Sequence, residues 1–124
     1  QQTLRAFYRQ LLRVARSEKA ITQGDMYDLT YAQGEGFNKH EQYAFIRKYK
    51  KQTLLVVLNF DDRQVDMQVR IPQDAFEYLK LEEESLAKAE DLLTGTEYTF
   101  PLHPHTPICL TLPAWKGVIL KIKG

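Results

Sequence analysis

Acidic side chains are the first residues of this 124-residue chain whose type could carry chemistry. Acid–base catalysis by carboxylates needs them within reach of a substrate in one pocket. Asp61 and Asp62 are adjacent at the expected end of a strand, where they suit a turn or a cap. Glu82–Glu84 is a run of like charge, which is typical of a solvated face. No spacing places two acids in one pocket, so we predict structural roles and no catalytic residue.

Histidines and a single cysteine are the next candidates. His103 and His105 are separated by one proline, and His40 is a possible third zinc ligand. The proline, and the lack of a nearby acid or cysteine pair, put the motif outside established zinc spacings. We therefore expect neither a metal site nor a cofactor. Cys109 lies in an apolar strand without an activating partner and is expected to pack as a small hydrophobe.

Composition narrows the class of protein. A net charge of +1 gives no reason to expect nucleic acid or an anionic membrane as a partner. The longest apolar run is about five residues, far below the roughly 20 that span a bilayer. One cysteine excludes an internal disulfide and is compatible with either redox compartment. No signal peptide is visible, but the first residue is Gln, so we make no prediction of localisation.

An amphipathic helix is expected first, followed by strands. Its apolar face has the i, i+3, i+4, i+7 spacing, and arginines occupy the other side. The apolar residues are Leu4, Phe7, Tyr8, Leu11, Leu12 and Ala15, and the arginines are Arg5, Arg9, Arg13 and Arg16. Period-two alternation then predicts strands at Asp25–Ala32, Tyr43–Tyr49, Thr53–Phe60, Val65–Ile71, Ala87–Leu93, Tyr98–Leu102, Ile108–Leu112 and Val118–Ile122, with a helical turn at Asp74–Leu79. This spacing predicts an all-β fold: an antiparallel β-sandwich of about eight strands, Greek-key in type, preceded by one N-terminal α-helix.

The strand Thr53–Phe60 is apolar on both faces. Leu54, Val56 and Leu58 point one way, and Leu55 and Val57 point the other. A strand in a small antiparallel sandwich needs only one apolar face. Other parts of a protein must therefore cover each side, which suggests a β-domain that packs against a larger structure.

Several segments, in order, resemble the α-amylase family of glycoside hydrolases. Residues 4–31, LRAFYRQLLRVARSEKAITQGDMYDLTY, are similar to the last helix of the catalytic barrel and the connector into the C-terminal β-sandwich, domain C. The hairpin YAFIRKYKKQTLLVVLNFDD is similar to the domain C pattern "aF.R......llvv.NF". LLTG and the terminal LPAWKGVILKI resemble its late strands. The resemblance implies a barrel-type helix and connector at residues 1–23 and a C-terminal sandwich at residues 24–124.

The resemblance implies a non-catalytic domain that stabilises a barrel. The family's catalytic carboxylates lie on barrel strand ends, and none of those motifs occurs here. The implied partner is the catalytic barrel of a parent enzyme that acts on α-glucans such as starch, with association of copies through the exposed interdomain face as a possibility. The residues expected at the interdomain seam are Leu4, Phe7, Tyr8, Leu11, Leu12, Leu55 and Val57.

Exposed aromatic side chains leave two other functions open. Trp115, in the PAWKG turn, and Tyr31 are the residues to test for stacking on sugar rings, although Trp is highly buried on average. Phe45 and Phe60 are expected in the core. The alternatives are thus a stand-alone carbohydrate-binding module and a protein-interaction sandwich unrelated to amylases.

Overall fold

A computed structural model describes residues 24–30 and 41–123, together with Ala6, Arg9, Gln10, Arg13 and Arg16. These five single residues are helical and their side chains are exposed. The expected seam residues of the N-terminal helix lie outside the described residues; they are Leu4, Phe7, Tyr8, Leu11 and Leu12. No helix within the described part of the chain is long and apolar enough to cross a membrane.

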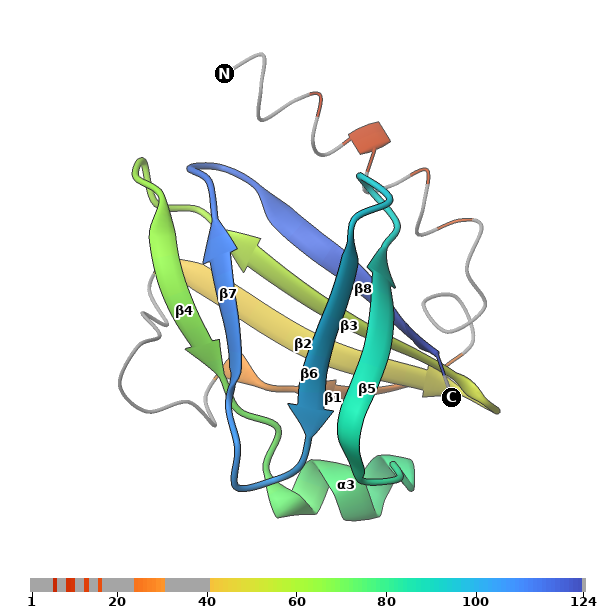
Figure 1. Ribbon diagram of the computed structural model, residues 1–124. Coiled ribbons are helices and arrows are strands. Elements are labelled where there is room, and N and C mark those ends of the chain that lie inside the picture. Colours follow the sequence, from red (N-terminus) through yellow and green to blue (C-terminus); the bar gives the residue numbers. More distant parts are fainter. Residues whose placement is uncertain are drawn as a thin grey trace.

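Two antiparallel sheets face each other across the core (Figure 1). The larger sheet has the strand order β1-β2-β3-β8-β5-β6, and the smaller one pairs β4 with β7. The strands are β1 (Asp25–Asp28), β2 (Gln42–Tyr49), β3 (Gln52–Asn59), β4 (Val65–Val69), β5 (Glu84–Asp91), β6 (Glu97–Leu102), β7 (Ile108–Leu112) and β8 (Gly117–Lys123). One helix, α3 (Gln73–Leu79), closes one end of the sandwich. The prediction of an all-β antiparallel sandwich of eight strands is confirmed.

Strand β3 lies in the middle of the larger sheet. It pairs with β2 in a register that sets Phe45 opposite Val56, and with β8 in a register that sets Val56 opposite Ile119. Because side chains alternate along a strand, β3 contributes to two separate clusters. Leu55 and Val57 face the smaller sheet, whereas the side chains between them face away from it.

The main core fills the space between the two sheets and α3. Leu55 and Val57 belong to it, fully buried, with side chains from β2, β4, β7, β8 and α3. This corrects the sequence interpretation, which assigned both residues to interdomain packing. Periodicity shows that two faces exist, but it does not show which of them the second sheet covers.

Two further expectations are corrected on the other strands. Cys109 is exposed, because β7 directs Ile108 and Leu110 into the core and Cys109 away from it. The expected strand Ala87–Leu93 is shifted: β5 runs from Glu84 to Asp91. Its first residue pairs with Leu102 on the edge strand β6, where a charged side chain can stay in solvent.

The start of the sandwich is described only in part. Strand β1 begins at Asp25, close to the boundary that the sequence places between residues 23 and 24. That division into a connector and a sandwich stays a prediction.

Gly117 allows β3 and β8 to approach closely. A Cβ atom at this position would lie 2.3 Å from the carbonyl oxygen of Val57 and 2.7 Å from Cδ2 of Leu58. Gly95 differs: its φ is +79°, and a Cβ would meet nothing within 4 Å.

We therefore predict that Gly117→Ala destabilises the fold by about 3 kcal/mol, because backbone of a central strand must shift. Gly95→Ala should cost about 1 kcal/mol, from the left-handed conformation alone. Urea unfolding of the two variants measures the difference. Equal losses would contradict the close approach of β3 and β8.

Candidate functional site: the outer face of the sheet and the corner at Asn59

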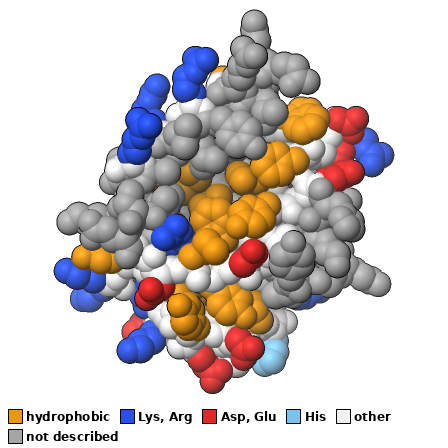
Figure 2. Space-filling view, turned by 180° about the vertical axis from the view of Figure 1, so that it is seen from behind, with side chains coloured by type: hydrophobic (Ala, Val, Ile, Leu, Met, Phe, Trp, Pro, Cys, Tyr) orange, Lys and Arg blue, Asp and Glu red, His pale blue; other side chains and the backbone are white. Residues whose placement is uncertain are grey.

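An apolar cluster lies on the face of the larger sheet that points away from the smaller one. We call it the outer-face cluster. Its buried members are Leu54, Val56, Leu58 and Ile119, and the partly buried side chains around them are Tyr43, Phe45, Tyr49, Phe60, Leu92 and Leu93. Figure 2 shows hydrophobic side chains crossing this face. Phe45 and Phe60, expected in the core, thus lie half-buried on the outer face.

The N-terminal segment contacts the sheet beside this cluster. Nε2 of Gln10 donates a hydrogen bond of 2.7 Å to the carbonyl oxygen of Leu93. Leu93 follows β5, and its side chain packs against the outer-face cluster. Position 10 of the chain is therefore held at the edge of the outer face.

Arg47 is a polar residue on the same face. It pairs with Leu54 across β2 and β3, so it follows Phe45 in the outward row of β2. Its Nη2 donates to the carbonyl oxygen of Gly24 at 2.8 Å. Its Nε is buried and has no hydrogen-bond partner. A buried donor without an acceptor is costly, so this atom marks a place where an acceptor would be favourable.

A hydrogen-bonded corner forms where β3 ends and β8 begins. Asn59 is its centre, with 1% of its surface exposed. Its Nδ2 lies 3.0, 3.3 and 3.1 Å from the carbonyl oxygens of Arg63, Leu112 and Pro113. Its Oδ1 accepts from the backbone N–H of Asp61 at 3.0 Å. One side chain thus ties the larger sheet to the turns at the ends of β4 and β7.

Trp115 lies at this corner. Its backbone N–H donates to the carbonyl oxygen of Asp61 at 3.2 Å, and its φ is 59°. The side chain is 37% exposed. Tyr31, the other residue considered for sugar stacking, lies outside the described residues.

A pair of carboxyl groups adjoins the corner. The hydrogen bond that Asp61 shares with Glu41, followed by the charge of Asp61, raises the pKa of Glu41 above its ordinary value. The same hydrogen bond lowers the pKa of Asp61. The two carboxyl groups are therefore coupled: Glu41 holds its proton more tightly than an ordinary glutamate, and Asp61 loses its proton more readily than an ordinary aspartate. Nε of Arg63 lies 3.7 Å from Oδ1 of Asp61 and adds a positive charge.

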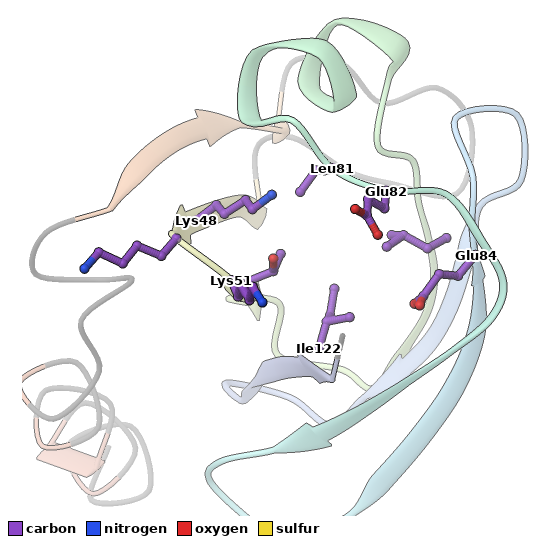
Figure 3. A pocket seen from close by; sticks show the side chains of 9 residues that line it. Lys48, Lys51, Leu81, Glu82, Glu84 and Ile122 are labelled. Atoms are coloured by element: carbon purple, nitrogen blue, oxygen red, sulfur yellow. The ribbon is translucent and has the colours of Figure 1, made fainter.

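A cleft of about 300 Å³ lies at the opposite end of the hairpin (Figure 3). Lys48 and Lys51 border it on one side, and Glu82 and Glu84 border it on the other. Nζ of Lys48 donates to the carbonyl oxygen of Lys80 at 2.6 Å, which ties β2 to the end of α3. The described residues that line this cleft include no aromatic side chain and none of the predicted site residues. We assign it a structural role.

His103 interacts with side-chain and backbone groups of the protein itself. Nδ1 of His103 accepts from the backbone N–H of His105 at 3.1 Å, and Nε2 lies 3.1 Å from Oε1 of Glu83. Both ring nitrogens of His103 therefore have partners within the protein. No group of three ligating side chains suited to a metal occurs within the described ranges, and His40 lies outside them.

Comparison with known families identifies this arrangement. Residues 37–123 match the family described as "Alpha amylase, C-terminal all-beta domain". The chain belongs to the α-amylase C-terminal all-β domain family. The resemblance found in the sequence is thereby confirmed. No curated protein matches the sequence.

Solved structures share the fold of this α-amylase C-terminal domain. A maltogenic α-amylase from Thermotoga neapolitana superposes with a TM-score of 0.64 over 91% of this chain, at 11% identity. The protein AmyP, crystallised with maltose, gives 0.59 over 90% at 13% identity. A trehalulose synthase mutant gives 0.56 over 95% at 24% identity. The chain spans only 24%, 19% and 18% of the lengths of these three proteins, and the likeness shows the fold alone.

Sequence reasoning missed most of the polar residues of the α-amylase C-terminal domain that the structure brings together. Asn59, Glu41 and Arg47 were not singled out. For Asn59 a signal was present, because a polar residue directly after five apolar ones at a strand end is a candidate to bond the neighbouring turns. Glu41 and Arg47 carry no such signal, since their partners are far away in sequence.

We predict that Asn59→Ala destabilises the domain by about 2–4 kcal/mol, because three carbonyl groups lose a buried donor. Gln68→Ala, at an exposed position on β4, should change stability by no more than about 0.5 kcal/mol. Chemical denaturation followed by circular dichroism measures both. A loss below about 1 kcal/mol for Asn59→Ala would refute its role as a tie.

The coupling of Glu41 and Asp61 predicts a pH dependence. The raised pKa of Glu41 stabilises the fold below its ordinary pKa, and this contribution is lost as pH rises through the folded-state pKa. The lowered pKa of Asp61 stabilises above its ordinary value, and that part is lost as pH falls through the folded-state pKa. Glu41→Gln keeps a donor toward Asp61 and removes one titration.

The advantage of Glu41→Gln over the wild type should therefore grow from mildly acidic to neutral pH. Unfolding midpoints across that range measure it, with Glu77→Gln on the exposed side of α3 as the matched control. A constant difference across the range would show that Glu41 and Asp61 are not coupled.

Proposed function

We propose that this chain is the non-catalytic C-terminal domain of an α-amylase-like glycoside hydrolase and that its outer face packs against the catalytic barrel. The observation that carries the proposal is the outer-face cluster. Six large apolar side chains remain partly exposed there, on a sheet whose other face is already covered. An antiparallel sheet with one solvated face normally carries polar side chains on that face.

Packing energetics favour an occupied outer face. Full burial of a side chain such as Phe or Leu is worth about 1.5–3 kcal/mol, and completing the burial of the half-buried Phe45 and Leu93 would gain part of that. Aromatic residues and arginine are also enriched at the buried centre of protein interfaces. Tyr43, Phe45, Arg47 and Tyr49 follow one another along the outward row of β2.

The acids of the described residues support a non-catalytic role. Glycoside hydrolysis uses two carboxyl groups about 5–9.5 Å apart across a sugar. Asp61 is buried and accepts from the Arg63 backbone N–H at 3.2 Å, so its carboxylate does not face an open site for a sugar. Glu82 and Glu84 border a cleft whose other side carries lysines. We therefore expect no glycosidase activity from the 124-residue chain by itself.

The substrate class of the parent is the finer part of the proposal. We assign it α-glucans such as starch, an assignment supported by family membership and by AmyP, which was crystallised with maltose. A trehalulose synthase has the same fold at 24% identity, so the fold does not decide between hydrolysis and transfer. The upstream coding sequence should encode a barrel with catalytic carboxylates, and a different upstream domain would overturn the proposal.

In the parent enzyme, Phe45→Ala should accelerate thermal inactivation of the catalytic barrel, because truncation removes apolar contact at the seam. A loss of about 1–2 kcal/mol at an interface centre is typical. Leu86→Ala is the control, since Leu86 is 61% exposed on β5 and outside both clusters. Residual hydrolase activity after heating measures the coupling.

Equal inactivation of the two variants would contradict a seam at the outer face. Sedimentation of the 124-residue chain tests the other occupant, a second copy. A dimer that Phe45→Ala dissociates would favour a protein-interaction role and would count against the barrel.

A further inference from the structure

Trp115 sits at the corner with an unfavourable backbone conformation and a partly exposed indole. Its φ of 59° falls in the left-handed region, which bulky residues rarely adopt. Such a conformation costs of the order of 1–3 kcal/mol and persists only where surrounding structure over-determines it. Gly is the residue that this conformation favours. A tryptophan here therefore calls for an explanation beyond the requirements of the turn.

Hydrogen bonds from the end of β3 and from the loop that follows it hold the turn on both sides of Trp115. The Trp115 N–H donates to the carbonyl oxygen of Asp61, and the Asn59 N–H donates to that of Lys116 at 2.8 Å. Nδ2 of Asn59 lies 3.1 Å from the carbonyl oxygen of Pro113. The backbone is thus held by hydrogen bonds on both sides of Trp115. A preorganised aromatic surface loses little freedom when a ligand binds.

Exposed charges of both signs lie on the two segments that meet at Trp115. Lys116 follows Trp115 in the turn, and Asp62 and Arg63 follow Asp61, whose carbonyl oxygen accepts from the Trp115 N–H. The side chains of Asp62 and Arg63 are 79% and 81% exposed and lie 3.9 Å apart, whereas Asp61 is buried. Exposed charges of both signs disfavour selection of an anion or a cation and suit a neutral ligand with many hydroxyl groups.

We propose that Trp115 is a stacking platform for one stretch of an α-glucan chain, with Arg63 and Asp62 hydrogen-bonding the sugar hydroxyls. The apolar face of a pyranose ring would lie on the indole, which combines a large apolar surface with one N–H donor. The site would hold polymeric substrate on this domain, apart from the site of hydrolysis. The ligand class rests on the proposed function.

The cleft at the other end of the molecule offers a contrast. It is lined by three lysines, Lys48, Lys50 and Lys51, and has no aromatic surface among its described lining residues. The corner at Trp115 is therefore a better candidate for sugar binding than the cleft.

The chain contains a single tryptophan, so its fluorescence reports on this position alone. We expect a saturable change in emission when the 124-residue chain is titrated with maltoheptaose to millimolar concentrations. Cellohexaose, which has β-linkages, should give no change. Absence of any response to maltoheptaose would overturn the proposal, and an equal response to cellohexaose would overturn the α-glucan assignment.

Retardation in native gels that contain soluble starch extends the test to variants without tryptophan. Trp115→Ala should weaken starch affinity by about tenfold or more, because a central aromatic contact is lost. Trp115→Tyr should retain most of the retardation, and Arg63→Ala should weaken it severalfold. Tyr78→Ala, at an exposed tyrosine on α3, is the control and should migrate as the wild type.

Unfolding midpoints for each variant separate binding from folding. Unchanged retardation of a folded Trp115→Ala variant would overturn the proposal. This outcome differs from failure of the proposed function, which the barrel-inactivation experiment with Phe45→Ala detects independently. A starch site that persists in a protein with no barrel would leave the platform intact and refute the parent enzyme.

Discussion

Burial of strand β3 on both faces is the constraint on which the rest of this domain depends. The strand lies between β2 and β8, and its alternating side chains divide the apolar residues into two clusters. Leu55 and Val57 require the smaller sheet and α3 on one side. Val56 and its neighbours require apolar cover on the other. The sandwich satisfies the first requirement by itself. On the outer face, Leu54, Val56 and Ile119 are fully buried, and the side chains around them remain partly exposed.

Buried polar side chains hold the turns at the ends of the sandwich. Asn59 joins the end of β3 to the turns beside it. Asp91, 2% exposed, has the same role at the end of β5, where its Oδ1 accepts from the N–H groups of Leu93 and Ile119. Each side chain satisfies backbone groups that strand pairing leaves free, which is what makes burial of polar side chains tolerable. In the proposed function, the outer face packs against the barrel and the Asn59 corner binds a sugar.

Much of the fold follows from local patterns. Six of the predicted strands coincide with observed ones to within about two residues, because alternation and turn residues act over short distances. The shift of β5 has a tertiary cause. The Asp91 carboxylate accepts from the Ile119 N–H on β8 and also from the Leu93 N–H and the Thr94 hydroxyl, which makes a turn of residues that are apolar enough to continue a strand. The sequence also does not show which face of β3 is interior, because the alternating apolar residues look the same on both faces until the second sheet packs against one of them.

By itself the sequence determined the all-β class, the central apolar hairpin and the family, since each rests on residue types and spacings along the chain, and it marked Trp115 as a candidate for exposure. Tertiary structure alone decided which face of β3 is interior and that Arg47 lies in the outward row with an unpartnered Nε. It also brought Glu41 beside Asp61, and Trp115 beside the loop that carries Arg63. The physical reason is that these contacts join residues distant in sequence, and their geometry exists only after the two sheets have paired and packed.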